Sequence, residues 1–230
     1  MFYPMAYNIE YLLYLLPGII LAMYAQAKVS TAFERYSRVR NSANLTGAQV
    51  ARLILDKNAL RDVKIEQVRG SMTDHYDPQE KILRLSESVY NVPSIAAVSV
   101  AAHEVGHALQ DADGYKPLHI RSFLVPAAQL GSNISIYLVL LGLFIRSFSF
   151  LINIGIALFC VAVLFQLVTL PVEFNASKRA ELELADGILP DSELEGTSTV
   201  LHAAALTYVA SLLTAIGTLL HLLSISKRRD

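Results

Sequence analysis

The chain has 230 residues, of which 53% are apolar and 17% charged, and its mean hydropathy is +0.42. This composition is oily for a soluble domain and is typical of a small membrane protein. The net charge of −1 argues against nucleic acid as a partner, and the single cysteine, Cys160, excludes both a disulfide framework and a zinc site built on several cysteines.

Four apolar segments approach or reach the roughly 20 residues that a helix needs to cross a bilayer. They are residues 9–27, 123–145, 148–172 and 201–223. Only Arg146 and Ser147 separate the second segment from the third, so we expect these two segments to form a tight membrane hairpin. The "AQA" at the end of the first segment resembles a signal-peptide cleavage site, but no Lys or Arg precedes the segment and its apolar run is long. We therefore expect a retained helix.

The basic residues predict the orientation. Residues 28–121 and 173–200 contain 15 of the 19 Lys and Arg, many of them beside predicted spans. By the positive-inside rule, residues 28–122 and 173–200 should lie in the cytoplasm and the N-terminus outside. The basic tail "KRRD" violates the rule if the fourth segment spans fully. A full span and a shallow or re-entrant helix both remain open for that segment.

The polar part after the first span begins with a predicted amphipathic helix in "LTGAQVARLILDKNAL". Thr46 is the expected N-cap and Gln49 has the capping-box spacing. The expected apolar stripe consists of Val50, Leu53, Ile54 and Leu60.

Residues 63–88 predict a strand or two and a hairpin. Apolar residues alternate at Val63 and Ile65 and recur from Ile82 to Leu85, with "DPQEK" as a turn in between. A helix should follow in "NVPSIAAVSVAAHEVGHALQDADG", with its start marked by Ser94 and its end by Gly114.

This last helix contains the motif "HEVGH". His103 and His107 are four residues apart, so both imidazoles project from one face and can share a zinc ion, while Glu104 is placed to act as general base. The small apolar residues before the motif indicate a helix buried in a core. The alternative is that both histidines are hydrogen-bonded core residues.

A catalytic zinc needs a third protein ligand. Asp113 has the spacing of a longer zincin motif, but Gln110 stands where that motif needs glycine. Other histidines remain open as ligands: His75, His119 and His202. Glu173 is the strongest candidate, because a carboxylate at a membrane boundary is costly unless it is paired and because a hairpin of two spans returns it to the side of His107. The alternative role for Glu173 is a carboxylate favoured at a helix N-terminus.

These motifs resemble a known family. "HEVGH", then "EFNASKRA" across a membrane hairpin, together with "DHYDPQEKILRLS" and "VLHAAALTYVA", is similar to the membrane-bound neutral zinc metallopeptidases of the YugP type. More distantly, the chain resembles the HtpX and CAAX-prenyl-protease gluzincins. The resemblance implies that His103, His107 and Glu173 bind Zn2+ and that Glu104 is the general base. Those relatives have Asp four residues after the third ligand, where this chain has Ser177.

The resemblance also implies that the strand near "ILRLS" is an edge against which an extended peptide lies. Asp74, His75 and Asp77 would then lie near the cleft, although an ordinary hairpin turn is an equal alternative. A group that stabilises the oxyanion is needed as well. The candidates are Asn175, Arg179, His202 and Tyr208.

The predicted fold is mostly α with a small β hairpin or sheet: a polytopic membrane protein with a zincin-like (gluzincin) metalloprotease core and about four apolar spans. We divide it into an N-terminal transmembrane helix (1–27), a cytoplasmic zincin-like part (28–122), a transmembrane hairpin (123–172), a third-ligand helix with an acidic loop (173–200) and a C-terminal apolar helix with a basic tail (201–230).

The predicted function is a zinc-dependent endopeptidase of a prokaryotic cytoplasmic membrane, with its active site on the cytoplasmic side. Its substrates would be peptides or proteins, misfolded membrane proteins among them, and its surroundings the lipid bilayer. Two alternatives are a non-catalytic membrane scaffold with a structural zinc and a metal transporter that uses His103, His107 and Glu173.

Overall fold

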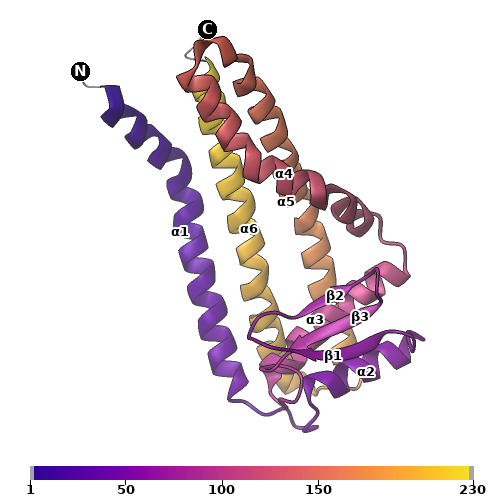
Figure 1. Ribbon diagram of the computed structural model, residues 1–230. Helices are drawn as coiled ribbons and strands as arrows, with labels where there is room; N and C mark the ends of the chain where they lie inside the picture. Colours follow the sequence, from indigo (N-terminus) through magenta and orange to yellow (C-terminus); the bar gives the residue numbers. More distant parts are fainter. Residues whose placement is uncertain (1–2, 228–230) are drawn as a thin grey trace. The chain divides into compact units, whose positions relative to one another are not determined.

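The computed structural model describes the backbone of residues 3–227 and the side chains of residues 12–227. The described chain is mostly helical and includes one small sheet (Figure 1). In chain order the elements are α1 (Tyr3–Ser37), α2 (Gly47–Lys57), β1 (Lys64–Val68), β2 (His75–Asp77), β3 (Ile82–Ser86), α3 (Ile95–Ala112), α4 (Lys116–Phe144), the short 3-10 helix η1 (Arg146–Phe148), α5 (Phe150–Ala185) and α6 (Asp191–Lys227).

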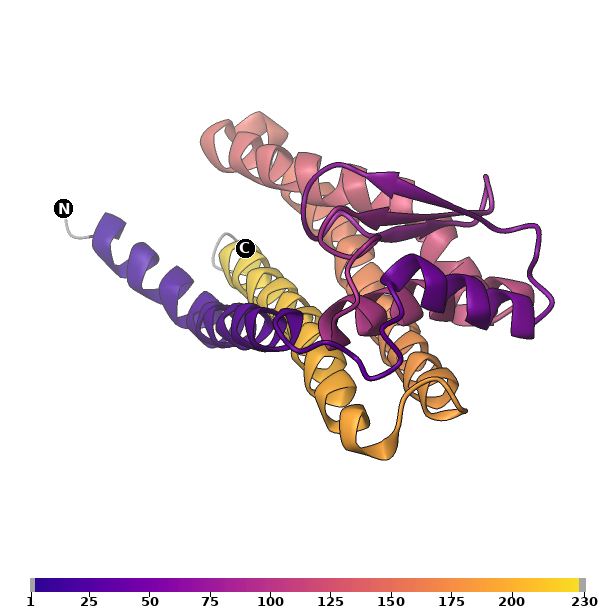
Figure 2. The same cartoon turned by 90° about the horizontal axis from the view of Figure 1, so that it is seen from below.

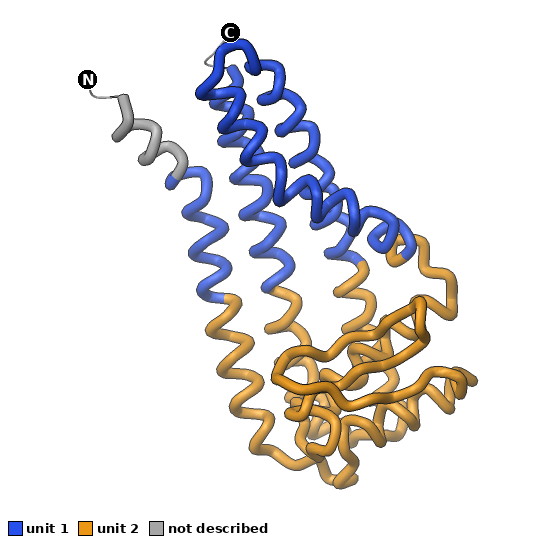
Figure 3. Tube along the Cα trace, in the orientation of Figure 1, with its two compact units in different colours: residues 1–24, 119–171, 207–230 blue, residues 25–118, 172–206 orange. Residues whose placement is uncertain are grey.

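The chain divides into two compact units (Figure 3). Unit 1 consists of the described residues up to 24, 119–171 and those from 207 on, and unit 2 consists of residues 25–118 and 172–206. The boundaries fall inside α1, α4, α5 and α6, so each of these helices has residues in both units and continues without a break from one to the other.

Unit 1 contains the apolar parts of four helices that are long and apolar enough to cross a membrane, namely α1, α4, α5 and α6. This agrees with the four predicted segments. Within the unit, α4 and α5 pack closely, because Gly155 has no side chain and a Cβ there would meet the backbone oxygen of Ser135 at 2.7 Å. Small residues at such crossings are typical of helices that associate in lipid. Large apolar side chains such as Phe123 and Phe144 are exposed, as they would be against acyl chains.

α6 runs unbroken through the fourth predicted segment and starts earlier than we expected. "DSELEG" was predicted to be an acidic loop, but Asp191 and Glu193 form the first turn of α6. The reason is electrostatic, since carboxylates are favoured beside the unpaired N–H groups of a helix N-terminus. The part of α6 from residue 207 on is about 30 Å long at ~1.5 Å per residue, which is the thickness of a bilayer core.

The sheet of unit 2 has the strand order β1-β3-β2. β2 and β3 form the predicted antiparallel hairpin, in which Tyr76 is opposite Leu83, and β1 pairs with β3 in parallel, with Glu66 opposite Arg84. β3 is therefore the central strand, and the expectation that "ILRLS" is an edge is wrong. Leu83 and Leu85 of β3 are fully buried, which suits a strand with a neighbour on each side.

α2 and α3 pack on each other and on the sheet (Figures 1 and 2). The capping box at Thr46 and Gln49 is confirmed by both of its hydrogen bonds. The predicted stripe is only partly correct, because Leu53 is 48% exposed while Ala51 and Leu55 are buried beside Val50 and Ile54. Each residue turns the helix by ~100°, and this places Leu53 on the side of Ile54 away from Ala51 and Leu55.

α3 begins and ends as the sequence predicts. The Ser94 side chain accepts a hydrogen bond from the backbone N–H of Ala97, and Gly114 follows the helix with a φ of 62°. Most of α3 is buried in the main core of unit 2, together with apolar residues of α2, the sheet and the last turns of α5. The motif "HEVGH" therefore lies on a helix fixed by packing along its length.

Candidate metal centre

His103 and His107 lie one turn apart on α3. Their ring centroids are 4.9 Å apart and the rings are nearly perpendicular, at 86°. His107 is buried and His103 is partly buried. The two imidazoles thus converge on one point, as the i, i+4 spacing predicts.

α5 places Glu173 against both histidines. The Oε2 atom of Glu173 lies 3.3 Å from His103 Nε2 and 3.7 Å from His107 Nε2. Glu173 is only 1% exposed, and it lies deep inside α5 rather than at a helix start, so the alternative of a helix-terminal carboxylate is wrong.

A glycine in the motif allows α3 and α5 to approach each other this closely. A Cβ at Gly106 would lie 2.5 Å from the backbone oxygen of Ala176, which is three residues after Glu173. Real Cβ atoms do not tolerate such a contact, so any side chain at Gly106 would push α5 away from the histidines.

The three side chains fit a zinc ion. Their ligand atoms all lie within 4.8 Å of one another, and among the described residues no other set of three His, Cys, Asp or Glu side chains meets this condition. Tetrahedral zinc with ligands at 2.0–2.1 Å separates neighbouring ligand atoms by about 3.4 Å, close to the two distances from Glu173. Two neutral imidazoles and a carboxylate are also a donor set of catalytic zinc sites, which leave a fourth position open.

The other ring nitrogen of each histidine has its own partner. His103 Nδ1 lies 3.1 Å from Ser177 Oγ, and His107 Nδ1 lies 3.0 Å from Gln110 Oε1. Such contacts orient an imidazole and leave Nε2 to face the metal. Ser177 thus occupies the place in which the distant relatives have Asp.

Gln110 was noted in the sequence only as a departure from a longer motif, yet it is fully buried and central to the site. Its Nε2 donates to the backbone oxygen of Val172 at 2.8 Å and to Asn175 Oδ1 at 2.9 Å. The sequence did contain one indication of this role: Gln110 is three residues after His107, and residues with this spacing are neighbours on one helix face.

Asn175 and Arg179, two of the residues considered for the oxyanion, are hydrogen-bonded to each other. Asn175 Oδ1 accepts hydrogen bonds from Gln110 and, at 2.9 Å, from Arg179 Nε. Arg179 also forms an ion pair with Asp113 at 2.5 Å, so Asp113 lies in a surface pair and outside the cluster of possible metal ligands.

Glu104 lies on α3 beside this cluster. Removal from water raises the pKa of its carboxyl to about 7; His103 opposes this rise, while Glu173 and Asp74 add to it. A partly buried carboxyl with a pKa near neutrality is suited to accept and return a proton.

The remaining predicted residues are not part of this cluster, although His75 is near enough to Glu104 to lower the pKa of its carboxyl. His202 on α6 is paired with Ser198 and, at 3.9 Å, with Glu181. His119 and Tyr208 belong to unit 1, whereas the three clustered side chains belong to unit 2. His75 is exposed and its Nδ1 donates to the backbone oxygen of Thr73 at 2.9 Å.

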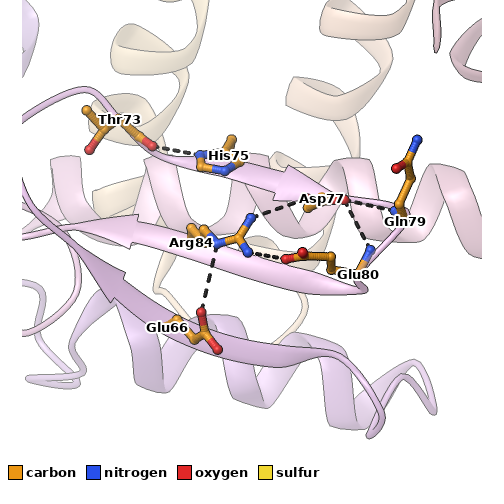
Figure 4. Close-up of polar contacts among 7 residues, drawn as sticks. All are labelled: Glu66, Thr73, His75, Asp77, Gln79, Glu80 and Arg84. Carbon is orange, nitrogen blue, oxygen red and sulfur yellow. Dashed lines mark hydrogen bonds and ion pairs between the residues drawn. The ribbon is translucent and has the colours of Figure 1, made fainter.

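The hairpin beside the site has a polar outer face (Figure 4). Arg84 of β3 pairs there with Glu66, Asp77 and Glu80, and Asp77 also accepts the backbone N–H groups of the turn. Asp77 therefore holds the turn and the strand. Asp74 holds the end of β3 by accepting hydrogen bonds from the N–H and hydroxyl of Ser86.

On the other face of the hairpin, β2 is attached to α3. The Tyr76 hydroxyl donates to Asp111 at 3.0 Å, and Asp111 follows Gln110 directly. Because side chains alternate along a strand, His75 and Asp77 point away from α3. Among the described residues β2 pairs only with β3, so β2 and not β3 is the edge strand next to the "HEVGH" helix.

The four apolar helices and the cluster of two histidines and a glutamate are the features expected of a membrane-bound protein with a zinc site. The family model described as "Putative neutral zinc metallopeptidase" matches residues 11–227, and the chain belongs to this family. It is similar to the "Putative membrane protease YugP" of Bacillus subtilis (strain 168), with 49% identity over 206 residues that cover 89% of this chain and 91% of the relative. No solved structure matches the chain significantly.

Proposed function

We propose that the protein is a zinc-dependent endopeptidase with a gluzincin-like core, in which His103, His107 and Glu173 hold the metal. The observation that supports this most directly is the approach of Glu173 to both Nε2 atoms, at 3.3 and 3.7 Å, on two helices that pack through Gly106. When bound, zinc supplies a Lewis acid and makes a water acidic enough to lose a proton near neutral pH.

Glu104 is the general base in this proposal. As the oxygen of the attacking water bonds to the peptide carbonyl carbon, Glu104 accepts one proton of that water. It then donates the proton to the nitrogen of the leaving amine as the carbon–nitrogen bond breaks, which returns Glu104 to its starting charge. Its burial supports this role, because a pKa near 7 allows both steps.

The substrate is a peptide or protein segment that pairs in extended form with the edge strand β2. β2 supports this because the Tyr76–Asp111 contact holds it against α3 while its outer edge has no partner strand among the described residues. Main-chain pairing at an edge binds peptides with little dependence on sequence. His75, an exposed residue of β2, remains a candidate for a direct contact with the substrate.

The chain is proposed to reside in the cytoplasmic membrane of a prokaryotic cell, with α1 retained and unit 2 on the cytoplasmic side. α1 runs unbroken through the "AQA" sequence, and its later part packs in unit 2, where Ala32 contacts a cluster with Ala96 and Val200. The excess of Lys and Arg in the segments that flank the spans supports the orientation. The division of the chain into five parts, from the N-terminal helix to the basic tail, belongs to the same proposal.

Cleavage of casein by the purified protein tests the proposal. We compare the wild type with Glu104→Gln, which keeps the size of the side chain and removes the base. The zinc content should be equal, and cleavage by the variant should fall at least a hundredfold. Glu87→Gln, at an exposed position, is the control and should cleave normally.

Equal cleavage by the wild type and Glu104→Gln, with zinc bound to both, would reject Glu104 as the base. Bound zinc without any cleavage of casein or of an unfolded membrane protein would instead favour the scaffold alternative with a structural zinc.

A further inference from the structure

In unit 1, the side of α4 that turns away from α5 carries an asparagine in the middle of a candidate membrane span. The opposite side of α4 packs on α5, where Gly131 and Ser135 are buried against Leu158 and Gly155. Asn133 is two residues from both Gly131 and Ser135, and two residues turn a helix by about 200°. Asn133 therefore faces away from α5, and its side chain is exposed.

The amide of Asn133 lies at a depth where it needs a hydrogen-bond partner. At ~1.5 Å per residue, Asn133 is about 15 Å or more from both ends of the apolar segment 123–145. Its amide has no hydrogen bond to any described residue, and α1 packs on α6 instead, through Gly18 and Thr214. An unpaired amide is costly in hydrocarbon, and asparagines of membrane helices typically hydrogen-bond to another helix. We therefore expect the partner of Asn133 on a second molecule.

The exposed residues on this side of α4 repeat with the spacing of a helix–helix interface. They are alternately three and four positions apart, and we call them the α4 seam: Leu130, Asn133, Tyr137, Leu140 and Phe144. This is the seven-residue repeat of left-handed helix pairs, in which each seam side chain fits between side chains of the facing helix. Tyr137 is 70% exposed only one turn from Asn133, although tyrosine is otherwise enriched at the membrane–water interface. The seam is thus suited to pack against a second helix with the same repeat.

A second copy of this chain has the properties that the partner needs. All copies are inserted in the same orientation, so a two-fold axis along the membrane normal pairs α4 with α4 in parallel and brings each seam residue to its equivalent. Asn133 then meets Asn133 of the other copy at the same depth. An amide has both donors and an acceptor, so the two side chains can hydrogen-bond to each other reciprocally. One asparagine within an otherwise mainly apolar seam also fixes the register and the number of paired helices.

We propose that the α4 seam is the interface of a homodimer in the membrane, in which the two Asn133 amides hydrogen-bond to each other. A different membrane protein would need both the repeat and a polar group at this depth, whereas a second copy has both by symmetry. The proposal requires that α4 spans the membrane, for which it is long and apolar enough. It does not depend on zinc or on peptidase activity.

Disulfide cross-linking tests which side of α4 faces the partner. The full chain carries Cys160→Ala, which removes its one cysteine, and a single new cysteine: Leu130→Cys or Tyr137→Cys in the seam, or Ser132→Cys as the control. Ser132 is also exposed and is next to Asn133, but it lies about 100° away around the helix. In lipid vesicles with a mild oxidant, the seam variants should form a linked dimer at least about fivefold faster than the control, because a disulfide needs Cβ atoms about 4 Å apart. Equal rates in all three variants, or the fastest rate in the control, would overturn the proposed interface.

The dimer affinity tests the role of Asn133. It is measured by energy transfer between labelled copies of the full chain while the vesicles are diluted with lipid. We expect Asn133→Leu, which removes the amide, to pair about tenfold more weakly, and Asn133→Gln, which keeps it, to stay within about threefold of the wild type. Ser132→Ala should pair like the wild type, because the Ser132 hydroxyl donates to the backbone oxygen of Gln129 in its own helix.

Two results would contradict the proposal. Equal affinities of Asn133→Leu and the wild type would show that the amides do not hold the dimer. A wild type that stays monomeric at every protein-to-lipid ratio would overturn the homodimer itself and leave this side of α4 to lipid or to another membrane protein.

Discussion

The ionised form of the Glu104 carboxyl is destabilised by its surroundings, because the side chain is removed from water. Its carboxyl has a pKa of about 7 in the folded metal-free chain, against about 4.3 in an unfolded one. Because the folded pKa is raised, the folded state is not penalised below about pH 4. The penalty grows between about pH 4.3 and 7 and is then complete, at about 4 kcal/mol. The carboxyl proposed as the base thus lowers the stability of the folded chain above about pH 4.3.

Glu104→Gln should therefore stabilise the metal-free protein at high pH. In thermal unfolding in detergent, we expect the variant to melt several degrees above the wild type at pH 8 and at nearly the same temperature at about pH 3.5, because the wild-type carboxyl is then mostly neutral in both states. Equal melting temperatures at pH 8 would show that Glu104 is hydrated and not buried.

Ser177 is the weaker of the two groups that orient the histidines. Ser177→Ala removes the partner of His103 Nδ1, and we expect zinc to bind up to about tenfold more weakly, as measured by chelator competition. Ser88→Ala, which removes a hydroxyl bonded only to Ser86 in the described hairpin region, should leave the affinity unchanged. Equal affinities of Ser177→Ala and the wild type would show that this contact does not support the metal.

At the residue scale, the sequence predicted the three side chains that the fold brings together as a possible metal site. The spacing of His103 and His107 and the cost of Glu173 at a membrane boundary were sufficient to select all three. The role of Gln110 could not be predicted, because a neutral amide does not carry the large cost that a carboxylate such as Glu173 has at a membrane boundary. Its role depends on three partners, two of them on α5, that only the fold brings together.

At the level of elements, the site is the crossing of α3 and α5, and Gly106 sets their separation. Gly106→Ala would place a Cβ against the backbone of Ala176, and backbone cannot move aside as a flexible side chain can. We expect a loss of about 1–3 kcal/mol in stability and at least a tenfold loss in zinc affinity, because α5 moves together with Glu173. Thermal unfolding and chelator competition measure the two effects.

Gly114→Ala is the matched control for this change. Gly114 has a φ of 62°, and a Cβ added there would have nothing within 4 Å, so alanine costs about 1 kcal/mol of backbone strain without displacing any helix. It should lower the melting temperature and leave the zinc affinity intact. If Gly106→Ala lowers only stability, the crossing does not determine the ligand geometry.

Local signals predicted the helices of unit 2 better than its sheet. The caps at Thr46 and Ser94 depend on residues within one turn, and both were correct. The sequence predicted no strand order, because β1 pairs in parallel with β3 across a connection that contains β2, and no local pattern specifies that pairing. The edge strand was consequently assigned to β3 instead of β2.

At the scale of the whole chain, hydropathy alone predicted the four candidate spans, since apolar length is a direct physical requirement of the bilayer. It did not predict that α1, α5 and α6 continue far beyond those segments into unit 2. Those extensions are amphipathic or polar, and packing within unit 2 rather than hydropathy makes them helical.

The proposed orientation is tested by cysteine labelling. In a Cys160→Ala background, Ser71→Cys places a thiol at an exposed position of unit 2. A membrane-impermeant maleimide should leave this thiol unlabelled in intact cells and label it in inverted membrane vesicles. Labelling in intact cells would place unit 2 outside and contradict the positive-inside assignment.

The central claim is that His103, His107 and Glu173 form one zinc site, and the zinc content of the purified protein tests it most directly. We predict one zinc per chain in the wild type and a loss of tight binding in Glu173→Ala, because two histidines alone leave the metal without its buried carboxylate. Unchanged tight zinc binding in Glu173→Ala would contradict the account.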